Sequence, residues 1–483
     1  MILLIFMVIR FYNTLSRKKE EFKPIKKNKV KIYSCGPTIY NFVHIGNLRA
    51  YVFTDILIKT LKYLKYDVLS VMNLTDVDDK TIRNSKKLIT DENKNPNDAL
   101  KQFTSIYEKA FYKDIESMNI AKTDIIPKAT DSIKEMEFII QKLFNKGYAY
   151  ESKDGIYFDI SKYKEYGKLI NLNLKEQKYN KKNRVVTDEY EKDNLQDFAL
   201  WKLKKDNEPS WTIKINDKEY IGRPGWHIEC SAMSYKFLGE IFDIHIGGVD
   251  LKFPHHENEV AQSSCAFGHN SQSNYWMHNE HLLVDNKKMS KSLGNFYTLR
   301  DLIDKGYDPL ALREVFFRSH YKQQLNFSFE SLDSGVVNVK KINDFYSKLK
   351  ITKPSEIIKN KIKEVYKDKI KQFKEALEDD LNTPNAISVI YEFMNEFNKL
   401  KEYSKEDLNL GIKFMEETNQ VVGLLKIQEE IPLEVLDLAK QRKEVRDNKN
   451  WEESDKLRNE IKELGYTIKD DKNAKNGFIL TSN

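Results

Sequence analysis

The sequence predicts an α/β protein with four parts in order: a nucleotide-binding domain on a parallel sheet, an insertion within it, an α-helical bundle, and a small α+β domain at the C-terminus. Two observations predict this order. An early stretch reads as strand, glycine-containing turn, helix and strand, which is a βαβ unit with parallel strands. From about Ser331 onward the apolar residues take helical spacing instead.

Composition sets broad limits on what the protein does. The 483 residues are 40% hydrophobic and 32% charged, a balance typical of globular domains. A net charge of +7 permits a nucleic-acid partner without demanding one. Three cysteines imply no disulfide framework and suit a reducing compartment.

The apolar start, MILLIFMVI, is too short to span a bilayer and predicts a buried first strand. We therefore expect a cytoplasmic protein with no membrane partner.

The βαβ unit begins with a strand over residues 29–36, and its helix carries an apolar stripe from Val52 to Leu64. At the turn into that helix lies the string His44-Ile45-Gly46-Asn47. A helix N-terminus offers unpaired N–H groups to a phosphate. Gly46 lets a ligand approach the backbone, and His44 can donate to phosphate oxygens, although so short a string is weak support by itself.

An insertion is expected at about residues 120–220. It includes a helix near residues 133–144 and a strand pair near GIYFDIS. The Lys- and Asn-rich text over residues 171–194 is too polar to bury, and we expect a mobile loop without chemistry there.

The stretch from Gly222 to Glu259 carries the candidate metal ligands. Cys230 lies in it, and His255 and Glu259 follow four residues apart, which places both on one face of a helix. Thiolate, imidazole and carboxylate are zinc ligands, and Cys35 upstream is a candidate for the fourth. The alternative is that the cysteines are small buried hydrophobes and the histidine pair only begins a helix. The third cysteine, Cys265, is expected to be an ordinary residue of the hydrophobic core.

A second candidate site follows in Lys288-Met289-Ser290-Lys291-Ser292, a basic loop that ends in glycine. Two ammonium groups three residues apart, with hydroxyls between them, suit a polyphosphate, and the alternative is a solvated loop.

Further on, Thr383 before Pro384 predicts the cap and first turn of a helix. Near the end, a helical hairpin carries basic residues that face either a nucleic-acid backbone or water: Lys440, Arg442, Lys443 and Arg446.

Together these strings resemble a known family. HIGN and KMSKS match the two signatures of class I aminoacyl-tRNA synthetases. The set SCGPTIY, NLTDVDDK, GRPGWHIECSAM, HIGGVD, FPHHENE and KMSKSLGN is similar to the cysteinyl branch of that class. The resemblance extends to DDLNTPNA and QRKEVRDNKNW, so it covers almost the whole chain.

The resemblance implies a Rossmann-like catalytic domain and a set of domain boundaries. The catalytic domain would occupy residues 1–120 and 221–275, with the insertion at 121–220, a KMSKS-bearing segment at 276–330, a helical-bundle anticodon-binding domain at 331–428 and a small anticodon-recognition domain at 429–483. It implies a ligase that converts ATP and L-cysteine to cysteinyl-adenylate and transfers the cysteine to the 3′ end of tRNA(Cys). We expect a monomer with one Zn²⁺ per chain, and Mg²⁺ with the ATP.

The resemblance also assigns site residues by position. The metal ligands would be Cys35, Cys230, His255 and Glu259. The catalytic residues would be His44, Asn47, Lys288 and Lys291. The ATP contacts would be His44, Gly46, Asn47, Gly247, Gly248 and Lys291. The cysteine pocket would include Thr75, Trp226 and Asp250. Asn47 stands where the class signature has a second histidine; it still donates an N–H but cannot become cationic.

The zinc ion would serve specificity. Exchanging SH for OH hardly alters size, and shape discriminates poorly between near-isosteres. Zinc binds a thiolate well and a neutral hydroxyl poorly, so a metal that contacts the substrate sulfur would exclude serine.

Two other functions are open to this sequence. One is an ATP-dependent ligase that joins cysteine to an amino sugar; such enzymes resemble the catalytic half and lack the helical extension. The other is a non-catalytic, zinc-containing RNA-binding relative, which should have lost residues such as His44 and Lys288 that are present here.

Overall fold

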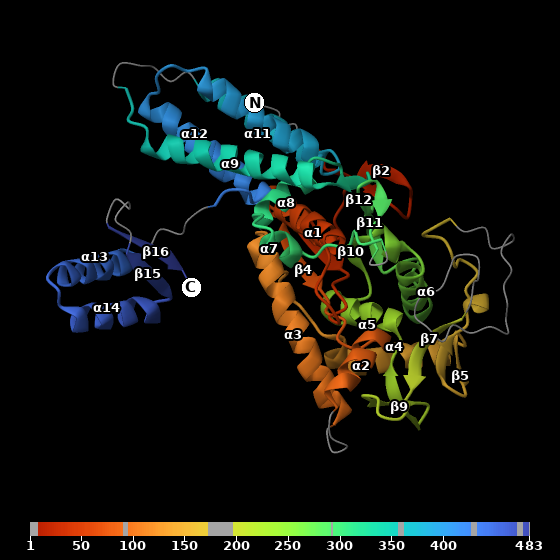
Figure 1. The fold of residues 1–483 in the computed structure, drawn as a ribbon. Coiled ribbons are helices and arrows are strands. Elements are labelled where there is room, and N and C mark those ends of the chain that lie inside the picture. Colours follow the sequence, from red (N-terminus) through yellow and green to blue (C-terminus); the bar gives the residue numbers. More distant parts are fainter. Residues whose placement is uncertain are drawn as a thin grey trace. The chain divides into compact units, whose positions relative to one another are not determined.

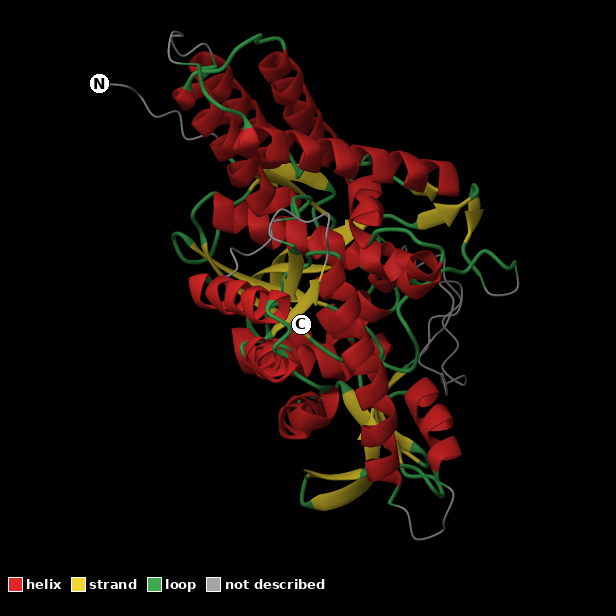
Figure 2. Cartoon of the chain, turned by 60° about the vertical axis from the view of Figure 1, so that its left-hand side comes forward, coloured by secondary structure: helices red, strands yellow, loops and turns green. Residues whose placement is uncertain are grey.

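The computed structural model has two compact units, residues 1–425 and 426–483 (Figures 1 and 2). The structure describes residues 8–89, 95–171, 197–290, 293–355, 362–426, 432–470 and 477–482. Most of the apolar start, and nearly all of the loop predicted at residues 171–194, therefore lie outside the described residues.

The centre of the first unit is a four-stranded, fully parallel sheet, which confirms the predicted α/β class. Its order is β11–β10–β3–β4. The strands are β3 (Lys29–Ser34), β4 (Asp67–Met72), β10 (Phe242–Gly248) and β11 (Ser273–Asn279). The chain leaves β3 toward β4 on one side and later returns to β10 on the other side. The strand order therefore reverses between β3 and β10, where α/β sheets place their ligands.

Both faces of the sheet are covered by helices. Alternate strand residues point to opposite faces, so Ile32 packs with Phe53 and Leu57 of α1 (Ile45–Tyr63). Its neighbour Tyr33 packs instead with residues of α5 (Trp226–Leu238) and α6 (His255–Phe267). This sandwich fixes the carboxyl ends of the strands relative to the first turns of all three helices.

The turn after β3 requires a glycine. A Cβ atom on Gly36 would lie 1.8 Å from the carbonyl oxygen of Asn73, so any side chain there would collide with backbone. The Gly36 N–H donates to the Asn73 side chain at 3.0 Å. This close approach joins the loops that follow β3 and β4.

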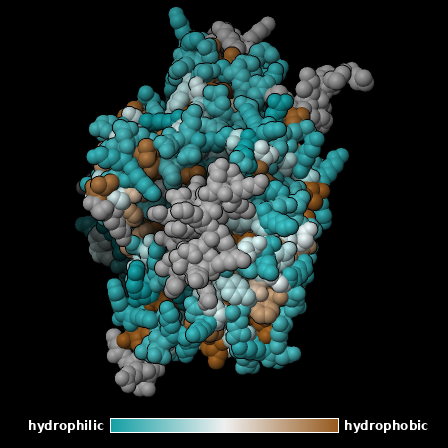
Figure 3. Space-filling view, turned by 90° about the vertical axis from the view of Figure 1, so that its right-hand side faces the viewer, coloured by the Kyte–Doolittle hydropathy of each residue, from teal (hydrophilic) through white to brown (hydrophobic). Residues whose placement is uncertain are grey.

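The insertion forms an antiparallel sheet with the order β5–β6–β7–β9–β8. Its elements are α4 (Ile133–Asn145), β5 (Ala149–Ser152), β6 (Gly155–Phe158), β7 (Phe198–Leu203), β8 (Trp211–Ile215) and β9 (Lys218–Pro224). The predicted helix and strand pair are confirmed. Around the atoms drawn in grey, the face of the molecule in Figure 3 is largely hydrophilic, with small separate apolar patches.

After β11 comes a small sheet that carries Lys288. It contains β12 (Leu282–Val284), β13 (Lys287–Lys288) and β14 (Leu325–Phe327). Asp285 and Asn286 join β12 to β13, both with positive φ, which matches the two-residue hairpin turn that Asp and Asn favour.

Five helices with a common apolar core follow: α8 (Pro309–Phe317), α9 (Phe329–Ile351), α10 (Lys363–Glu378), α11 (Thr383–Asn398) and α12 (Lys405–Val422). The N-cap predicted at Thr383 is wrong by one residue. Asn382 is the N-cap and accepts from the Asn385 N–H, which leaves Thr383 as the first helical residue.

The remaining elements of the first unit connect these parts: β1 (Arg10–Asn13), β2 (Lys18–Glu21), α2 (Asp79–Ser85), η1 (Lys86–Leu88), α3 (Pro96–Ser117), η2 (Ala129–Ser132), η3 (Ile160–Lys162), η4 (Val249–Lys252) and α7 (Leu299–Asp304). Across the residues that the structure describes, no helix is both long and apolar enough to cross a membrane.

The second unit is a helical hairpin and a two-stranded sheet with their own core. Its elements are α13 (Leu433–Asp447), α14 (Trp451–Glu463), β15 (Tyr466–Asp470) and β16 (Phe478–Ser482). Arg442, one of the basic residues expected to face RNA or water, does neither. It is 1% exposed and its guanidinium donates to Asp470 at 2.8 and 3.3 Å.

One buried cation ties three parts of the first unit together. The Arg313 side chain, on α8, is fully buried and donates to Asp55 of α1 at 2.6 Å. The same guanidinium donates to the carbonyl oxygens of Met118, after α3, at 3.1 Å, and of Val422, at the end of α12, at 2.7 Å. Because the charge is paired and its donors are used, it can be buried at a tolerable cost.

We predict that Arg313→Ala destabilises the first unit by about 3–5 kcal/mol, because the variant removes the buried guanidinium that pairs with Asp55, which keeps only Lys59 as a cationic partner, and that donates to the carbonyl oxygens of Met118 and Val422. Differential scanning calorimetry would show this as a lower Tm for that unit. Lys340→Ala is the matched control, since its partner Asp344 and Lys340 itself are 63% and 71% exposed; it should cost less than about 1 kcal/mol. Equal Tm values for the two variants would contradict the prediction.

Candidate metal centre and active site

Two distant segments meet at the switch point of the parallel sheet and bring four potential ligands together. Cys35 directly follows β3, and Cys230 lies in α5. His255 is the first residue of α6, and Glu259 is one turn further on. All four residues are buried. Helical spacing alone brings His255 close to Glu259 in α6. Cys35 reaches the other three residues because β3, which precedes it, pairs with β10.

The four ligand atoms lie within 4.8 Å of one another. The Cys35 and Cys230 Sγ atoms are 3.8 Å apart, and Cys35 Sγ is 3.7 Å from Glu259 Oε1. His255 Nε2 is 3.4 Å from Cys230 Sγ and 3.2 Å from Glu259 Oε1.

These distances fit a tetrahedral metal site. Zinc lies about 2.3 Å from sulfur and about 2.0 Å from nitrogen or oxygen, so a tetrahedron places two sulfurs about 3.8 Å apart and a nitrogen and an oxygen about 3.3 Å apart. The mixed edges to sulfur come to about 3.5 Å by the same construction. The donor set therefore has the shape, as well as the chemistry, that a zinc ion requires.

A second group of possible ligands shares two of these residues. Cys35 and Glu259 also lie close to His245 and His256. His256 Nε2 is 3.3 Å from Cys35 Sγ, while His245 Nε2 is 2.9 Å from Glu259 Oε2. His245 thus contacts a different Glu259 oxygen from the one that Cys35 and His255 contact, and this is the outer oxygen.

These extra histidines support the cluster from behind. The outer oxygen of Glu259 is held by His245 and by the Gln272 amide at 3.2 Å. His256 in turn contacts His278 through its other ring nitrogen at 2.8 Å. Such outer contacts orient ligands around a metal. These contacts were not predicted from the sequence; the only signal was the presence of histidines in apolar strands, which also fits ordinary core.

Burial dominates the electrostatics of the cluster. It raises the pKa of the Cys35 thiol well above its usual value, and the neighbouring Cys230 adds to the rise. Burial likewise raises the pKa of Glu259, again with a contribution from Cys230, and lowers the pKa of His256 well below its usual value. Several anionic ligands in one buried site require a compensating cation, which a divalent metal would supply.

A cavity of about 400 Å³ opens beside the cluster. Among the residues predicted for the site, eleven line this cavity: Cys35, His44, Gly46, Asn47, Thr75, Trp226, Cys230, Gly248, Asp250, His255 and Lys288. Glu259 does not line the cavity, so the cavity meets the cluster at the two cysteines and His255.

His44 is the N-cap of α1. Its Nδ1 accepts the Asn47 N–H at 3.2 Å, and the Asn47 side chain accepts the His44 N–H at 3.4 Å. Burial lowers the pKa of His44 to about 4, against a smaller opposing effect of Asp250. The imidazole is therefore neutral near pH 7 with its proton on Nε2, which can donate one hydrogen bond to a ligand. The cap uses the backbone N–H and the side-chain oxygen of Asn47. The side-chain NH₂ group of Asn47 therefore remains to donate to a ligand.

The residues predicted to bind the amino acid surround the metal ligands. The Trp226 ring lies 4.3 Å from the His255 ring, centroid to centroid. Thr75 follows β4, and its backbone pairs with the Pro37–Ile39 loop next to Cys35. Asp250 lies in η4, after β10.

The predicted phosphate-binding residues are only partly observed. Lys288 ends β13 and lines the cavity, but Lys291 lies outside the described residues. Gly247 does not line the cavity; a Cβ atom there would lie 2.7 Å from the His256 ring, so its small size serves packing against that ring.

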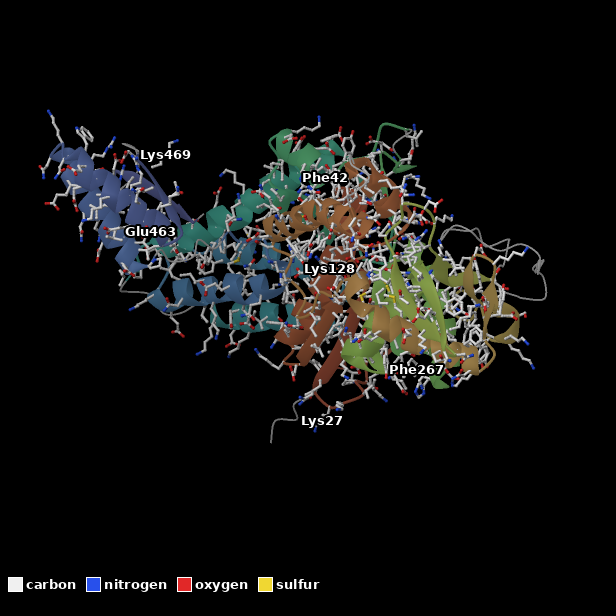
Figure 4. All side chains as sticks on the ribbon, turned by 90° about the horizontal axis from the view of Figure 1, so that it is seen from below. Lys27, Phe42, Lys128, Phe267, Glu463 and Lys469 are labelled. Atoms are coloured by element: carbon white, nitrogen blue, oxygen red, sulfur yellow. The ribbon has the colours of Figure 1, made fainter. Side chains whose placement is uncertain are left out.

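An aromatic and a cationic side chain meet at another part of the cavity wall. Phe42, labelled in Figure 4, is 38% exposed and lines the cavity. The Arg300 guanidinium of α7 lies 4.3 Å from the centre of its ring, and the Tyr107 ring of α3 lies 5.3 Å from it. This group was not predicted from the sequence.

Comparison with family models gives three matches along the chain. Residues 21–338 match the tRNA synthetases class I (C) catalytic domain. Residues 372–426 match the DALR domain, and residues 428–475 match the cysteinyl-tRNA ligase anticodon binding domain.

Curated relatives match nearly end to end. The chain is 43% identical to a cysteine–tRNA ligase of Brachyspira hyodysenteriae, covering 96% of this chain and 97% of the relative. It is 42% identical to one of Protochlamydia amoebophila, with 96% of each chain covered. Among solved structures, a methionyl-tRNA synthetase of Mycobacterium tuberculosis in complex with methionyl-adenylate shares the fold, with a TM-score of 0.56 at 12% identity over 82% of this chain and 90% of that one.

The His44 geometry predicts a pH-dependent contribution to stability. The pKa of His44 is about 4 in the folded chain, and 6.5 is the ordinary value for a histidine, which applies in the unfolded chain. Between these two pH values the unfolded chain therefore binds more protons than the folded chain. The stability that neutral His44 contributes is complete above pH 6.5 and is lost as the pH falls toward 4. His44→Asn preserves an N-cap but does not titrate. In urea denaturation, the stability of wild type relative to His44→Asn should therefore decrease from pH 7 to pH 5. A constant or increasing difference would contradict a buried, neutral His44.

Proposed function

This chain belongs to the cysteine–tRNA ligase family of class I tRNA synthetases, and on that premise we propose that its metal cluster and cavity activate L-cysteine for tRNA(Cys). As a member of the family the chain is an ATP-dependent aminoacyl-tRNA ligase that forms AMP. In the first step the cysteine carboxylate attacks the α-phosphorus of ATP and pyrophosphate leaves. In the second step the cysteinyl group passes to the 3′ end of tRNA(Cys).

The observation that carries the metal proposal is the shape of the donor set. We propose that Cys35, Cys230, His255 and Glu259 hold one Zn²⁺, because their measured separations match the edges of a zinc tetrahedron. The set that includes His245 and His256 fits a supporting role better, since His245 faces the outer oxygen of Glu259. When bound, zinc supplies a soft cation that favours a thiolate over a hydroxyl.

The cavity places the selective group where it can act. The sulfur ligands and His255 line the cavity wall, so an amino-acid side chain in the cavity can reach the metal. Trp226 stacks near His255 and would pack against the short side chain of cysteine. Serine has nearly the same size, so these contacts alone would hold it almost as well. Selection of cysteine would therefore rest on the metal.

The opposite part of the cavity suits the nucleotide. Adenylation needs no general base, because the carboxylate is already a nucleophile; it needs positioning and stabilisation of charge on the departing pyrophosphate. We propose that the α1 N-terminus with His44, Gly46 and Asn47 contacts the ATP phosphates. Lys288 and Lys291, with Mg²⁺ that accompanies ATP, would stabilise the charge on pyrophosphate, and Gly248 would border the nucleotide.

The C-terminal part is proposed to bind the tRNA. Residues 428–475 match a family model for anticodon binding, so tRNA is the macromolecular partner. We keep the proposed boundaries for the helical bundle, 331–428, and for the small domain, 429–483. We also propose that the protein acts as a monomer in the cytoplasm, where protein synthesis supplies its tRNA and where its free cysteines stay reduced.

The first experiment is ATP–pyrophosphate exchange with cysteine or serine, on protein whose zinc content has been measured. We expect exchange with cysteine, at least about 100-fold less with serine, and one zinc per chain. Charging assays with tRNA(Cys) and with an amino sugar would follow, and only tRNA(Cys) should be charged. The amino-sugar ligase and the non-catalytic protein are not favoured by relatives that match along the full chain. Absence of exchange by zinc-loaded protein would contradict the proposed reaction.

Cys230→Ser tests the metal set directly. A hydroxyl is a poor zinc ligand, so the variant should bind less than about half an equivalent of zinc, and its KM for cysteine should rise at least about 10-fold. Its KM for ATP should change little, because Cys230 lies on the amino-acid side. Cys265→Ser is the matched control, since Cys265 is also buried but lies outside the cluster. An unchanged KM for cysteine in Cys230→Ser would overturn the assignment.

A further inference from the structure

One buried carboxylate next to the cavity has no role in the reaction as described so far. Glu229 lies in α5 and directly precedes Cys230. Trp226 is three residues before Glu229, so the two side chains lie on the same side of the helix. It is 0% exposed. Its Oε2 accepts the Thr75 hydroxyl proton at 3.0 Å, while within the described part of the chain its Oε1 has no hydrogen-bond partner. A buried, unsatisfied carboxylate oxygen is costly, so its retention calls for a reason.

The contacts of Thr75 determine what its hydroxyl can offer to a ligand. A hydroxyl has one proton to donate and two lone pairs. Thr75 gives its proton to Glu229 and receives the Asn73 amide N–H at 3.2 Å. The orientation of that amide is fixed, because its oxygen accepts the Gly36 N–H at 3.0 Å. Only one lone pair of Thr75 remains, and Thr75 lines the cavity.

We propose that Glu229 is a positioning residue that, through Thr75, turns this part of the cavity into a receptor for the ammonium group of the amino acid. A hydroxyl that can only accept suits an ammonium and not a carboxylate. The Glu229 carboxyl group behind it accepts the Thr75 proton, and no cationic side chain pairs with it within the described residues. The proposal rests on the proposed function, because it takes the amino acid to bind in this cavity with its sulfur toward the metal.

The arrangement also fixes the direction in which the amino acid lies. Its sulfur would point to Cys35 and Cys230, and its ammonium would point to Thr75. Its carboxylate is then left to face the α1 N-terminus, where the ATP phosphates are proposed to bind. Glu229 would thus contribute to reactivity without touching the substrate.

The test compares three thiols on wild type and Glu229→Gln. Cysteine has both charged groups, cysteamine lacks the carboxylate, and 3-mercaptopropionate lacks the ammonium. Glu229→Gln should raise the KM for cysteine in pyrophosphate exchange about 10-fold, with kcat changed less than about 3-fold. The inhibition constant of cysteamine should rise by a similar factor, and that of 3-mercaptopropionate should stay within about 2-fold. Zinc content should remain at one per chain.

A double-mutant cycle tests the link through Thr75. Thr75→Val alone should raise the KM for cysteine about 10-fold, and adding Glu229→Gln to it should raise the KM by less than about 2-fold more, because the relay is already broken. Glu314→Gln is the matched control: Glu314 is 1% exposed in α8, away from the cavity, and its replacement should leave all three thiols unaffected.

Three results would overturn the proposal. Equal weakening of 3-mercaptopropionate and cysteamine would show that Glu229 serves the fold or the metal. An unchanged KM for cysteine in Glu229→Gln would show that the Glu229 carboxyl group does not position Thr75. Fully multiplicative effects of the two substitutions would show that Thr75 does not carry the effect. None of these results resembles failure of the proposed function, which would appear as absent cysteine-dependent exchange in the wild type.

Discussion

The site depends on the burial of two thiols, an imidazole and a carboxyl against one another at the end of a parallel sheet. Without a cation this burial is unfavourable, because the anionic forms of the ligands are desolvated and repel one another. With a divalent cation the same four groups join the segment after β3 to α5 and α6. Cys35, Cys230 and Glu259 thus belong to the fold as much as to the chemistry, and the surrounding histidines hold the ligand atoms in place.

The arrangement separates two tasks within one cavity. On one side the metal cluster, Trp226 and Thr75 are proposed to distinguish the amino acid. On the other side the N-terminus of α1 and the hairpin that carries Lys288 are proposed to offer hydrogen-bond donors and positive charge to phosphates. The switch point of the sheet makes this division possible, because β3 and β10 end side by side and the loops from both strands open into the same space.

Much of this could be predicted from the sequence, for physical reasons. Helical spacing placed His255 next to Glu259, and the pattern of strand, turn and helix placed His44 at the start of α1, where the phosphate site stays a prediction. Other features could not be predicted. A histidine in a buried strand, such as His245, has the same pattern whether it supports a metal ligand or only fills the core. The role of Glu229 depends on Thr75, 154 residues earlier in the chain. Arg442 lies in a run of basic residues typical of a surface, yet its side chain is buried and pairs with Asp470.

Selection of cysteine by this site requires that a zinc ion held by the cluster contacts the sulfur of the substrate. Zinc K-edge X-ray absorption on the zinc-loaded protein measures this contact, with no ligand, with cysteine and with serine. We expect one additional sulfur neighbour at about 2.3 Å when cysteine is added and no change with serine. An unchanged zinc environment at saturating cysteine would contradict it, and the selection of cysteine would then have to arise from the protein side chains alone.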